Sequence, residues 1–426
     1  MEIALLGLGT VGSAVARLLE QNRSDIEAKA GGPIHIRWAL VRTADRPRSV
    51  PEDVRVVTDP ARILEDPEVE MVIEVMGGEE PAFELMRSAL LRGKTVVTAN
   101  KDVVAAHGEA LEQAASATEA EIYYEGAVGG GIPIVRSLQM SLSANRIERV
   151  YGVLNGTTNF ILTRMEESGW SYADALAEAQ RQGYAEADPA ADVDGVDAAR
   201  KIAILSGIAF NRRVHPGDVR TEGIRSVTAA DIRHARGFHW RIRLLAAAVR
   251  RDERLEIAVG PTLIPDRHPL AAVRDAMNAV YVVGDALGEA MFYGAGAGGD
   301  PTASAVVGDL VEAARNRRLG ARRLRTGPMP PVALVPADRS VAPHYLRLRV
   351  SDRPGMLARL TGVLAEAEVS ANWVVQEPES PDFAEVVIVT HEASEAQIAV
   401  ALERMARERG VEVGCHLRVL AVPVTR

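Results

Sequence analysis

Over the first third of the chain, short apolar segments of strand length alternate with helical patterns. Apolar runs of strand length that end in polar or glycine-rich turns lie at residues 2–12, 34–41, 71–78, 95–102 and 121–133, and helical patterns follow at residues 13–20 and 81–91. Strands that alternate with helices in this way are typical of a parallel sheet with helices on both faces. The pattern therefore predicts an α/β first domain over residues 1–133.

The periodicity changes after residue 133. Helical patterns at residues 135–142 and 160–167, an apolar helix starting at Val196, and strand-like runs at 147–154, 255–259 and 279–283 predict an α+β second domain over 134–300. A further helical pattern follows at residues 305–315. We expect residues 301–320 to fold back onto the first domain. A segment rich in arginine and proline, residues 316–343, predicts an extended tether.

A third domain is predicted over residues 344–426. Strand patterns at residues 344–350, 369–375, 384–390 and 411–422 enclose helical patterns at 356–366 and 394–409. The order strand, helix, strand, strand, helix, strand is that of a ferredoxin-like unit. Together the three segments predict a chain of class α/β that ends in a small ferredoxin-like domain.

Composition restricts the class of function. The 426 residues carry a formal net charge of −9, which argues against nucleic acid or an anionic membrane as a partner. Cys415 is the single cysteine, so an internal disulfide and a cysteine-rich zinc site are excluded. The chain opens directly on a strand-like segment without a signal core or a long apolar span, and we expect a cytoplasmic protein that acts on small molecules.

The first strand leads into the pattern Gly7-x-Gly9-x-x-Gly12, and a helix follows it. Glycines in this context let the turn approach a pyrophosphate while the helix N-terminus faces its charge, so the pattern predicts a dinucleotide site. After the second strand come Arg42, Thr43, Arg46 and Arg48, which favour the 2'-phosphate of NADP. Asp45 lies close enough to keep NAD open.

Several loops carry polar or glycine-rich sequences that can form a site. Lys101 directly follows a buried strand, where residues line the cofactor crevice of a doubly wound sheet. The run from Glu125 to Pro133 can hold a cation through oxygen ligands, although its spacing alone favours a hinge. The polar segment Asn155 to Asn159 opens a helix and can bind a carboxylate or act as a plain cap, and the glycine-rich loop 294–304 starts another helix.

An acidic stretch, residues 183–201, ends in Lys201. Asp197 and Lys201 are four apart, so on a helix their side chains lie on one face. Such a pair is usually an exposed ion pair, but the apolar run from Ile202 to Phe210 predicts a helix buried inside a domain. Lysine is otherwise rare here, being present only as Lys29, Lys94 and Lys101, and we therefore interpret Lys201 as a titratable amine at a site.

These motifs together resemble those of homoserine dehydrogenase, in the monofunctional form with a C-terminal ACT domain. The motifs that carry the resemblance are GLGTVG at 7–12, TANK at 98–101, EGAVGGGIP at 125–133, NGTTNFIL at 155–162, DVDGVDAARK at 192–201, GAGAGGDPTASAVVGDL at 294–310 and DRPGML at 352–357. The resemblance implies a Rossmann-type nucleotide-binding domain, a catalytic and dimerisation domain, and an ACT domain. It implies reversible, NAD(P)-dependent reduction of L-aspartate 4-semialdehyde to L-homoserine, on the way to threonine and methionine.

The resemblance also implies roles for individual residues. Those matching catalytic positions are Lys201, Lys101 and Asp197; those matching substrate contacts are Gly156, Thr157, Tyr184, Glu186 and Asp192. Cofactor contacts fall on Gly7, Gly9, Thr10, Val11, Gly12, Arg42, Gly77, Lys101 and Gly298, and a sodium-type metal site falls on Glu125 and the carbonyls of Val128, Gly130 and Ile132. Asp352, Gly355 and Asn372 match contacts of an L-threonine effector, and a homodimer or homotetramer is implied.

Two other functions are open on the residues alone. One is an amino-acid sensor that keeps the nucleotide-binding fold without turnover. Such a sensor would not need the full set of Lys101, Glu186, Asp192, Asp197 and Lys201. The other is a related dehydrogenase that acts on a different semialdehyde.

Overall fold

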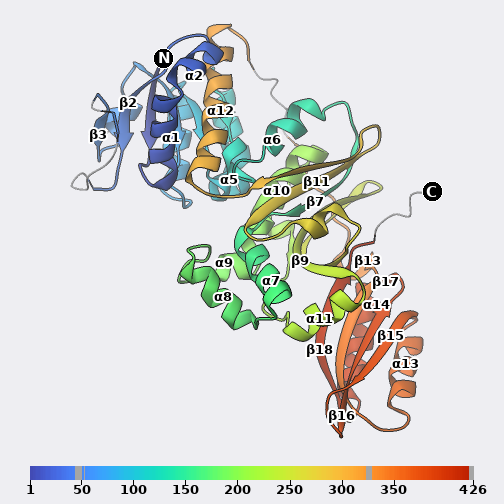
Figure 1. The fold of residues 1–426 in the computed structure, drawn as a ribbon. Coiled ribbons are helices and arrows are strands. Elements are labelled where there is room, and N and C mark those ends of the chain that lie inside the picture. Colours follow the sequence, from blue (N-terminus) through green and yellow to red (C-terminus); the bar gives the residue numbers. More distant parts are fainter. Residues whose placement is uncertain (44–49, 52, 323–328, 422–426) are drawn as a thin grey trace. The chain divides into compact units, whose positions relative to one another are not determined.

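The structure is a computed structural model, and it describes residues 1–43, 50, 51, 53–322 and 329–421 (Figure 1). The chain divides into two compact units, each built from separate stretches of sequence. Unit 1 comprises Met1–Val150, Arg200–Asp218 and Asn278–Val332, and unit 2 comprises Tyr151–Ala199, Val219–Met277 and Ala333–Arg426.

Unit 1 contains a six-stranded parallel sheet in the order β3-β2-β1-β4-β5-β6. Its strands are β1 Glu2–Leu6, β2 His35–Leu40, β3 Arg55–Val57, β4 Val69–Glu74, β5 Thr95–Thr98 and β6 Ile122–Tyr123. The helices among them are α1 Thr10–Gln21, α2 Arg23–Ala30, α3 Ala61–Leu64, α4 Ala82–Leu91 and α5 Lys101–Ser116. This strand order is that of the dinucleotide-binding fold, as the alternating pattern predicts.

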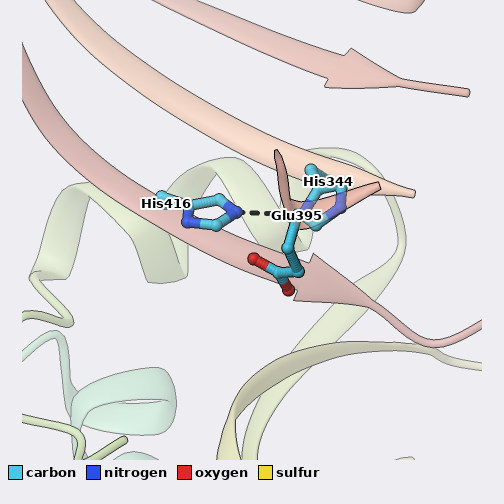
Figure 2. Close-up of side chains that lie close together, drawn as sticks. All are labelled: His344, Glu395 and His416. Atoms are coloured by element: carbon cyan, nitrogen blue, oxygen red, sulfur yellow. Dashed lines mark hydrogen bonds between the residues drawn. The ribbon is translucent and has the colours of Figure 1, made fainter. Parts of the chain in front are cut away.

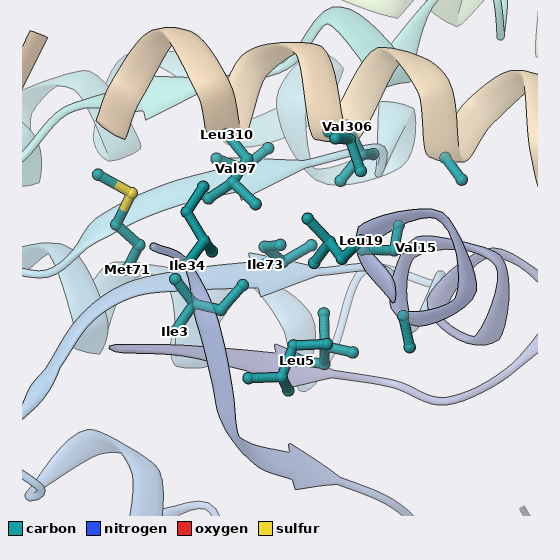
Figure 3. Close-up of a cluster of buried hydrophobic side chains, with 14 of the residues drawn as sticks. Ile3, Leu5, Val15, Leu19, Ile34, Met71, Ile73, Val97, Val306 and Leu310 are labelled. Carbon is teal, nitrogen blue, oxygen red and sulfur yellow. The ribbon is translucent and has the colours of Figure 1, made fainter. Parts of the chain in front are cut away.

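A helix from much later in the chain completes the core of unit 1. Helix α12, Gly299–Arg318, packs beside α1, and its Val306 and Leu310 are fully buried against Ile3 and Ile73 of the central strands (Figure 3). A second apolar cluster packs α4 and α5 on the other side of the sheet, around Met86 and Leu111. The sheet is therefore covered on both faces, which explains why its central strands are mostly apolar.

Unit 1 also holds elements that follow the sheet in sequence. These are η1 Glu125–Ala127, α6 Ile134–Arg136, the π-helical turn η2 Ser137–Ser141, η3 Pro216–Asp218, β12 Gly288–Ala295 and, apart from its first residue, β11 Met277–Gly284. The helix predicted over residues 135–142 is confirmed over most of that range, and its winding changes from α to π after Arg136. Strand β7, Ile147–Val153, and helix α10, Val196–Phe210, run from one unit into the other.

Unit 2 is built around a long antiparallel hairpin and the C-terminal domain. The hairpin strands are β9 Trp240–Arg251 and β10 Arg254–Pro265; the other elements are α7 Gly156–Ser168, α8 Tyr172–Arg181, α9 Ala190–Val193, β8 Arg220–Thr221, α11 Ala229–Gly237, η4 Pro269–Ala272 and η5 Ala337–Arg339. Only residues 255–259 of this hairpin were expected as strand, and the structure extends the strand at both ends.

The C-terminal domain has the predicted βαββαβ order. Its main elements are β14 His344–Ser351, α13 Met356–Glu366, β15 Ala371–Pro378, β16 Phe383–Thr390, α14 Glu395–Arg407 and β18 Val411–Val419. In the sheet, β18 lies between β14 and β10, and its pairing with β10 joins the domain to the hairpin through Thr262 and Leu263. The domain is therefore continuous with the rest of unit 2.

The segment expected as an extended tether forms several backbone pairings. Helix α12 continues to Arg318, so the connection begins later than residue 316. Beyond it, Pro331 pairs with Arg213 inside unit 1, and Leu334 pairs with Leu255 inside unit 2. Strand β13, Val341–Ala342, then pairs with β17, Ala393–Ser394. The described part of this extended segment is therefore held by pairing, because some of its backbone groups find partners along the way.

Among the residues that the structure describes, no helix is both long and apolar enough to span a membrane.

Candidate active site

The turn between β1 and α1 has the geometry of a dinucleotide cradle. Gly7 has φ +109°, and a Cβ placed on Gly12 would lie 2.1 Å from the carbonyl oxygen of Gly7. A Cβ on Gly9 would meet nothing within 4 Å, so the backbone there is open to a ligand. Gly9 is the N-cap of α1 and gives no side-chain cap, which leaves the first N–H groups of the helix to a phosphate. The turn fits the cofactor.

A second helix begins close to this turn. Gly298 caps α12 at φ +117°, and a Cβ on Gly299 would lie 3.1 Å from Cγ2 of Thr10. Thr10 and Val11 form the first residues of α1, so the two glycine-rich loops of unit 1 adjoin. Arg42 lies exposed just after β2, whereas Asp45, Arg46 and Arg48 lie outside the described residues.

Lys101 is positioned by a buried polar network that the sequence does not reveal. Asn100 caps α5 by accepting from the N–H groups of Asp102 and Val103, and its Nδ2 donates to the carbonyl oxygen of Gly78 at 2.7 Å. Fully buried Glu74 accepts from Oγ1 of Thr98 at 2.6 Å. Burial raises the pKa of Glu74 despite these hydrogen bonds. A glutamate inside an otherwise apolar strand is the signal that could have identified it.

Lys201 lies on α10, and the helix is as buried as its apolar sequence predicts. Ile202 and Leu205 are fully buried, and Lys201 itself is 8% exposed. Asp197 lies on the same helix four positions earlier, which is about one turn. Within unit 1, the neighbouring Arg200 pairs with Asp102 of α5 at 3.0 Å, so this part of α10 is tied to the helix that begins with Lys101.

In unit 2, one amide joins two of the predicted carboxylates. Nδ2 of Asn155 donates to Oδ1 of Asp192 at 2.7 Å and to Oδ2 of Asp197 at 2.9 Å. The same Asn155 caps α7 by accepting from the N–H of Thr158 through Oδ1. Oγ1 of Thr157 lies 2.9 Å from Oδ2 of Asp192 and 2.6 Å from the carbonyl oxygen of Tyr184. Asn155 was expected only as a cap or an anion donor, and its contact with the acids is new.

The remaining acids of the stretch are distributed differently. Asp194 pairs with Arg225, which lowers the pKa of its carboxyl, so it belongs to an ordinary ion pair near the surface. Glu186 is exposed, and none of the described hydrogen bonds joins its carboxylate to the Asn155 cluster. The ring of Tyr184 packs on Phe160 at a centroid distance of 4.8 Å. Gly156 begins α7, and a Cβ there would lie 2.8 Å from the carbonyl oxygen of Ala276.

The Glu125 loop is a tightly packed turn in unit 1. Oε1 and Oε2 of buried Glu125 accept from the N–H groups of Val135 and Arg136 at 2.9 and 2.7 Å, so the carboxylate caps α6. A Cβ on Gly130, which has φ +55°, would lie 2.7 Å from the carbonyl carbon of Gly296. With the carboxylate engaged, the loop offers a cation mainly backbone oxygens, including those of Val128 and Ile132.

Asp309 is a further buried acid at this loop. Its Oδ2 accepts from the N–H of Glu125 at 2.7 Å, and its Oδ1 pairs with Arg136 at 2.7 Å. Burial nevertheless raises the pKa of Asp309 to about 7.

The predicted effector residues lie in the C-terminal domain. Asp352 accepts from Nε2 of Gln376 at 3.2 Å, and Gly355 precedes α13 at φ +90°. Asn372 lines a groove of about 800 Å³ together with Trp373, Trp240 and His391. Trp373 stacks on Trp240 with a centroid distance of 5.3 Å, so this large residue has a packing role.

Comparison with known proteins identifies the family of each segment. Three family models match: the homoserine dehydrogenase NAD-binding domain at residues 7–125, homoserine dehydrogenase at 133–311, and the ACT domain at 344–410. Homoserine dehydrogenase of Bacillus subtilis is 42% identical, over 95% of this chain and 94% of its own. That of Corynebacterium glutamicum is 43% identical, over 94% and 91%.

Solved structures give the same result. The crystal structure of a homoserine dehydrogenase from Thiobacillus denitrificans superposes with a TM-score of 0.93 at 40% identity, covering 99% of this chain and 98% of that one. One from Staphylococcus aureus gives 0.79 at 35% identity, with 99% of both chains covered. The chain therefore belongs to the homoserine dehydrogenase family, and its activity is that of a homoserine dehydrogenase, an oxidoreductase with a nicotinamide-dinucleotide-binding domain.

Proposed function

We propose that this homoserine dehydrogenase works with NADP and that Asp192, Asp197 and Lys201 carry its substrate chemistry. The observation that supports this most directly is the Asn155 cluster, which holds the carboxylates of Asp192 and Asp197 on one amide nitrogen. The helix that begins at Val196 then presents Lys201 one turn after Asp197.

The acidic cluster is suited to the amino group of the substrate. L-Homoserine and L-aspartate 4-semialdehyde both carry an ammonium group, and two carboxylates that share one neutral donor concentrate negative charge there. We assign Asp192 to this ammonium, with Thr157 fixing the carboxylate through its hydroxyl. Glu186, Tyr184 and Gly156 are assigned to the same substrate as further contacts, which the family match supports.

Lys201 is assigned to proton transfer at the substrate oxygen. When bound, the reduced nicotinamide supplies a hydride to the aldehyde carbon, and negative charge develops on the oxygen. An ammonium beside that oxygen stabilises the charge and delivers the proton as the alkoxide forms. Asp197 orients Lys201 in this assignment, and the buried part of α10 behind the lysine limits access of water. Lys101, at the first turn of α5, is assigned as the second lysine near the nicotinamide.

The preference for NADP rests on the end of β2. Arg42 is exposed there, and a guanidinium is the usual partner of a 2'-phosphate. The Gly7 to Gly12 turn, Gly77 and the Gly298 cap are assigned to the rest of the dinucleotide. A monovalent cation, sodium being our assignment, is proposed at the carbonyls of the Glu125 loop, since its glycines let backbone oxygens turn toward one centre.

The proposal is tested by following reduced-cofactor absorbance with L-aspartate 4-semialdehyde, for each nicotinamide in turn. We expect turnover with a lower KM for NADPH than for NADH, and we expect Arg42→Ala to raise the KM for NADPH by roughly 10-fold or more with little change for NADH. An equal effect on both cofactors would contradict the role of Arg42. Absence of turnover with both would instead support the sensor reading.

Regulation by L-threonine is a separate proposal that concerns the ACT domain. Asp352, Gly355 and Asn372 are assigned to the effector. Adding L-threonine to the wild type and to Asn372→Ala separates the cases: inhibition that weakens in the variant supports the assignment, and identical curves contradict it. Assembly as a homodimer or homotetramer is proposed on the family match alone and is tested by light scattering.

A further inference from the structure

Two histidines and a glutamate meet inside the C-terminal domain, away from the residues assigned to catalysis. His344 on β14, Glu395 at the start of α14 and His416 on β18 offer one ligand atom each, all within 4.8 Å of one another (Figure 2). His344 is fully buried, and the other two are partly buried. The figure shows the two imidazole rings and the carboxylate converging from three different elements.

The hydrogen bonds determine which nitrogen of each ring can accept a metal ion. Nε2 of His344 lies 3.2 Å from the carbonyl oxygen of Ala393, which can only accept, so that nitrogen carries the proton and Nδ1 keeps its lone pair. Nδ1 of His344 lies 2.9 Å from Nε2 of His416. A ring whose outer nitrogen donates to a backbone carbonyl while the inner one points at a second ligand is the arrangement found around protein-bound metals.

The arginine contacts of Glu395 all fall on one of its two carboxylate oxygens. Arg220 and Arg418 approach it at 2.9 and 2.6 Å, and both contacts fall on Oε1. Oε2 therefore remains as the ligand oxygen. The two guanidiniums hold the carboxylate in place, as outer contacts of a metal ligand do.

Acidic groups outnumber basic groups around the cluster. The two guanidiniums face three carboxylates, those of Glu395, Glu256 and Glu222, and Arg418 also bonds Glu256 at 2.7 Å. Burial lowers the pKa of His344 and that of His416. Neutral imidazole is the form that binds metals.

We propose that His344, Glu395 and His416 form a site for a divalent transition-metal ion of the zinc type, with Nδ1 of His344, Nε2 of His416 and Oε2 of Glu395 as ligands and water in the fourth position. Binding requires the proton of His416 to move from Nε2 to Nδ1, with no net loss of protons. It also requires the two nitrogens to separate from 2.9 Å to about 3.3 Å, the spacing that Zn–N bonds of about 2.0–2.1 Å give in a tetrahedron.

An ion at this site would join three elements of the C-terminal domain. The strand β18 that carries His416 is also the one that pairs with β10, and Arg418 on it bonds Glu256 of β10. Metal binding is therefore expected to stabilise the attachment of the C-terminal domain to the hairpin.

The test is calorimetric titration of the full chain with Zn²⁺ after removal of metals by a chelator. We expect one equivalent bound by the wild type, and a dissociation constant raised roughly 100-fold or more in His416→Ala and at least about 10-fold in Glu395→Gln. Two variants are used so that a folding defect in one does not decide the result. Each is checked by circular dichroism and by unchanged homoserine dehydrogenase turnover.

The matched control is His391→Ala, which removes an exposed histidine of the same domain outside the cluster. It should bind Zn²⁺ as the wild type does. The proposal is overturned if the wild type binds no ion, or if folded His416→Ala and Glu395→Gln bind it unchanged. Loss of the ion in His234→Ala would also overturn it, by assigning the ion to the second cluster of His234, Glu377 and Glu385.

Discussion

At the scale of single residues, the site depends on how Asn155 holds two acids. Its Nδ2 reaches both Asp192 and Asp197, while its Oδ1 caps α7, so the side chain is fixed at both ends. Two carboxylates close together repel one another unless a cation comes between them or near them. In the assignment proposed above, a substrate ammonium supplies that cation, and an acidic cluster, instead of one acid, would therefore suit the amino group.

His35 gives a prediction of pH dependence in unit 1. Hydrogen bonds from Nδ1 to Glu2 at 2.9 Å and from Nε2 to Asp53 at 2.7 Å raise the pKa of His35. A raised pKa means that the folded state binds the proton more tightly, so the stabilisation is complete below the unfolded value of about 6.5 and is lost as pH rises through the folded value.

We therefore expect the wild type to be more stable than His35→Asn at pH 6 and to lose that advantage by pH 9. Solvent screens the pair, because the imidazole is 38% exposed, and the difference should be about 0.5 kcal/mol. Urea unfolding at the two pH values measures it. A difference that stays the same at both would show that the histidine contributes by packing alone.

Candidate residues could be predicted from the sequence where a motif fixes their chemistry. Lys201 and Asp197 follow from helical spacing and from the apolar helix after them, and both are indeed buried. The contacts of Glu74 and Asn155 could not be predicted from the sequence, because each partner comes from another element and the pairing exists only after folding. The roles of the candidate residues are implied by the family resemblance, whereas their hydrogen-bond partners are visible only in the folded structure.

At the scale of elements, the turn between β1 and α1 contains two glycines with different structural roles. Gly12 packs against the backbone of Gly7, whereas Gly9 faces open space. We expect Gly12→Ala to destabilise unit 1, since its Cβ would lie 2.1 Å from a carbonyl oxygen that cannot move without breaking the turn. Overpacking of this kind costs about 1–3 kcal/mol.

Gly9→Ala is the matched control, because φ −78° at that position suits alanine and nothing lies near the new methyl group. We expect it to fold as the wild type does but to bind NADPH more weakly, because the methyl group enters the space that the pyrophosphate approaches. Thermal unfolding and cofactor fluorescence separate the two effects. Equal stability of both variants would contradict the close approach at Gly12.

Two features of the fold could not be predicted from sequence patterns, and each has a physical reason. Strand β9 contains leucines and alanines that favour helix in isolation, and it becomes a strand because it pairs along its whole length with β10. The π-helical turn after α6 has no sequence signature of its own. By contrast, the parallel strands and the glycine turns of unit 1 were predictable. Burial on both faces of the sheet gives each central strand a nearly continuous apolar run in the sequence.

At the scale of the whole molecule, buried ion pairs connect the ACT domain to the rest of unit 2. Fully buried Asp231 on α11 accepts from Nε of Arg347 on β14 at 2.7 Å and from the hydroxyl of Tyr345 at 3.1 Å. Burial alone would raise the pKa of Asp231, but Arg347 and Thr228 bring it below its usual range. The acid is therefore charged at neutral pH and depends on its partners.

We expect Asp231→Ala to lower the free energy of unfolding by about 3–5 kcal/mol, because the buried Arg347 would lose its partner at 2.7 Å and keep, among the described carboxylates, the longer contact with Glu385 at 3.3 Å. Asp231→Leu combined with Arg347→Met should recover most of that loss, since both charges are then removed. Asp194→Ala is the control: its pair with Arg225 is exposed and should cost about 1 kcal/mol or less. Denaturant unfolding of the wild type and the three variants measures these free energies. Similar losses of stability for Asp231→Ala and Asp194→Ala would contradict the structural role of the buried pair.

The central claim is that Lys201 transfers the proton during homoserine dehydrogenase turnover. The most direct measurement compares kcat for L-aspartate 4-semialdehyde reduction in the wild type, in Lys201→Ala and in Lys29→Ala, which removes an exposed lysine from α2. Loss of a general acid predicts a decrease in kcat of about 100- to 10,000-fold for Lys201→Ala, with NADPH binding retained, and no change for Lys29→Ala. A Lys201→Ala protein that keeps a kcat within a few-fold of the wild type would contradict the account.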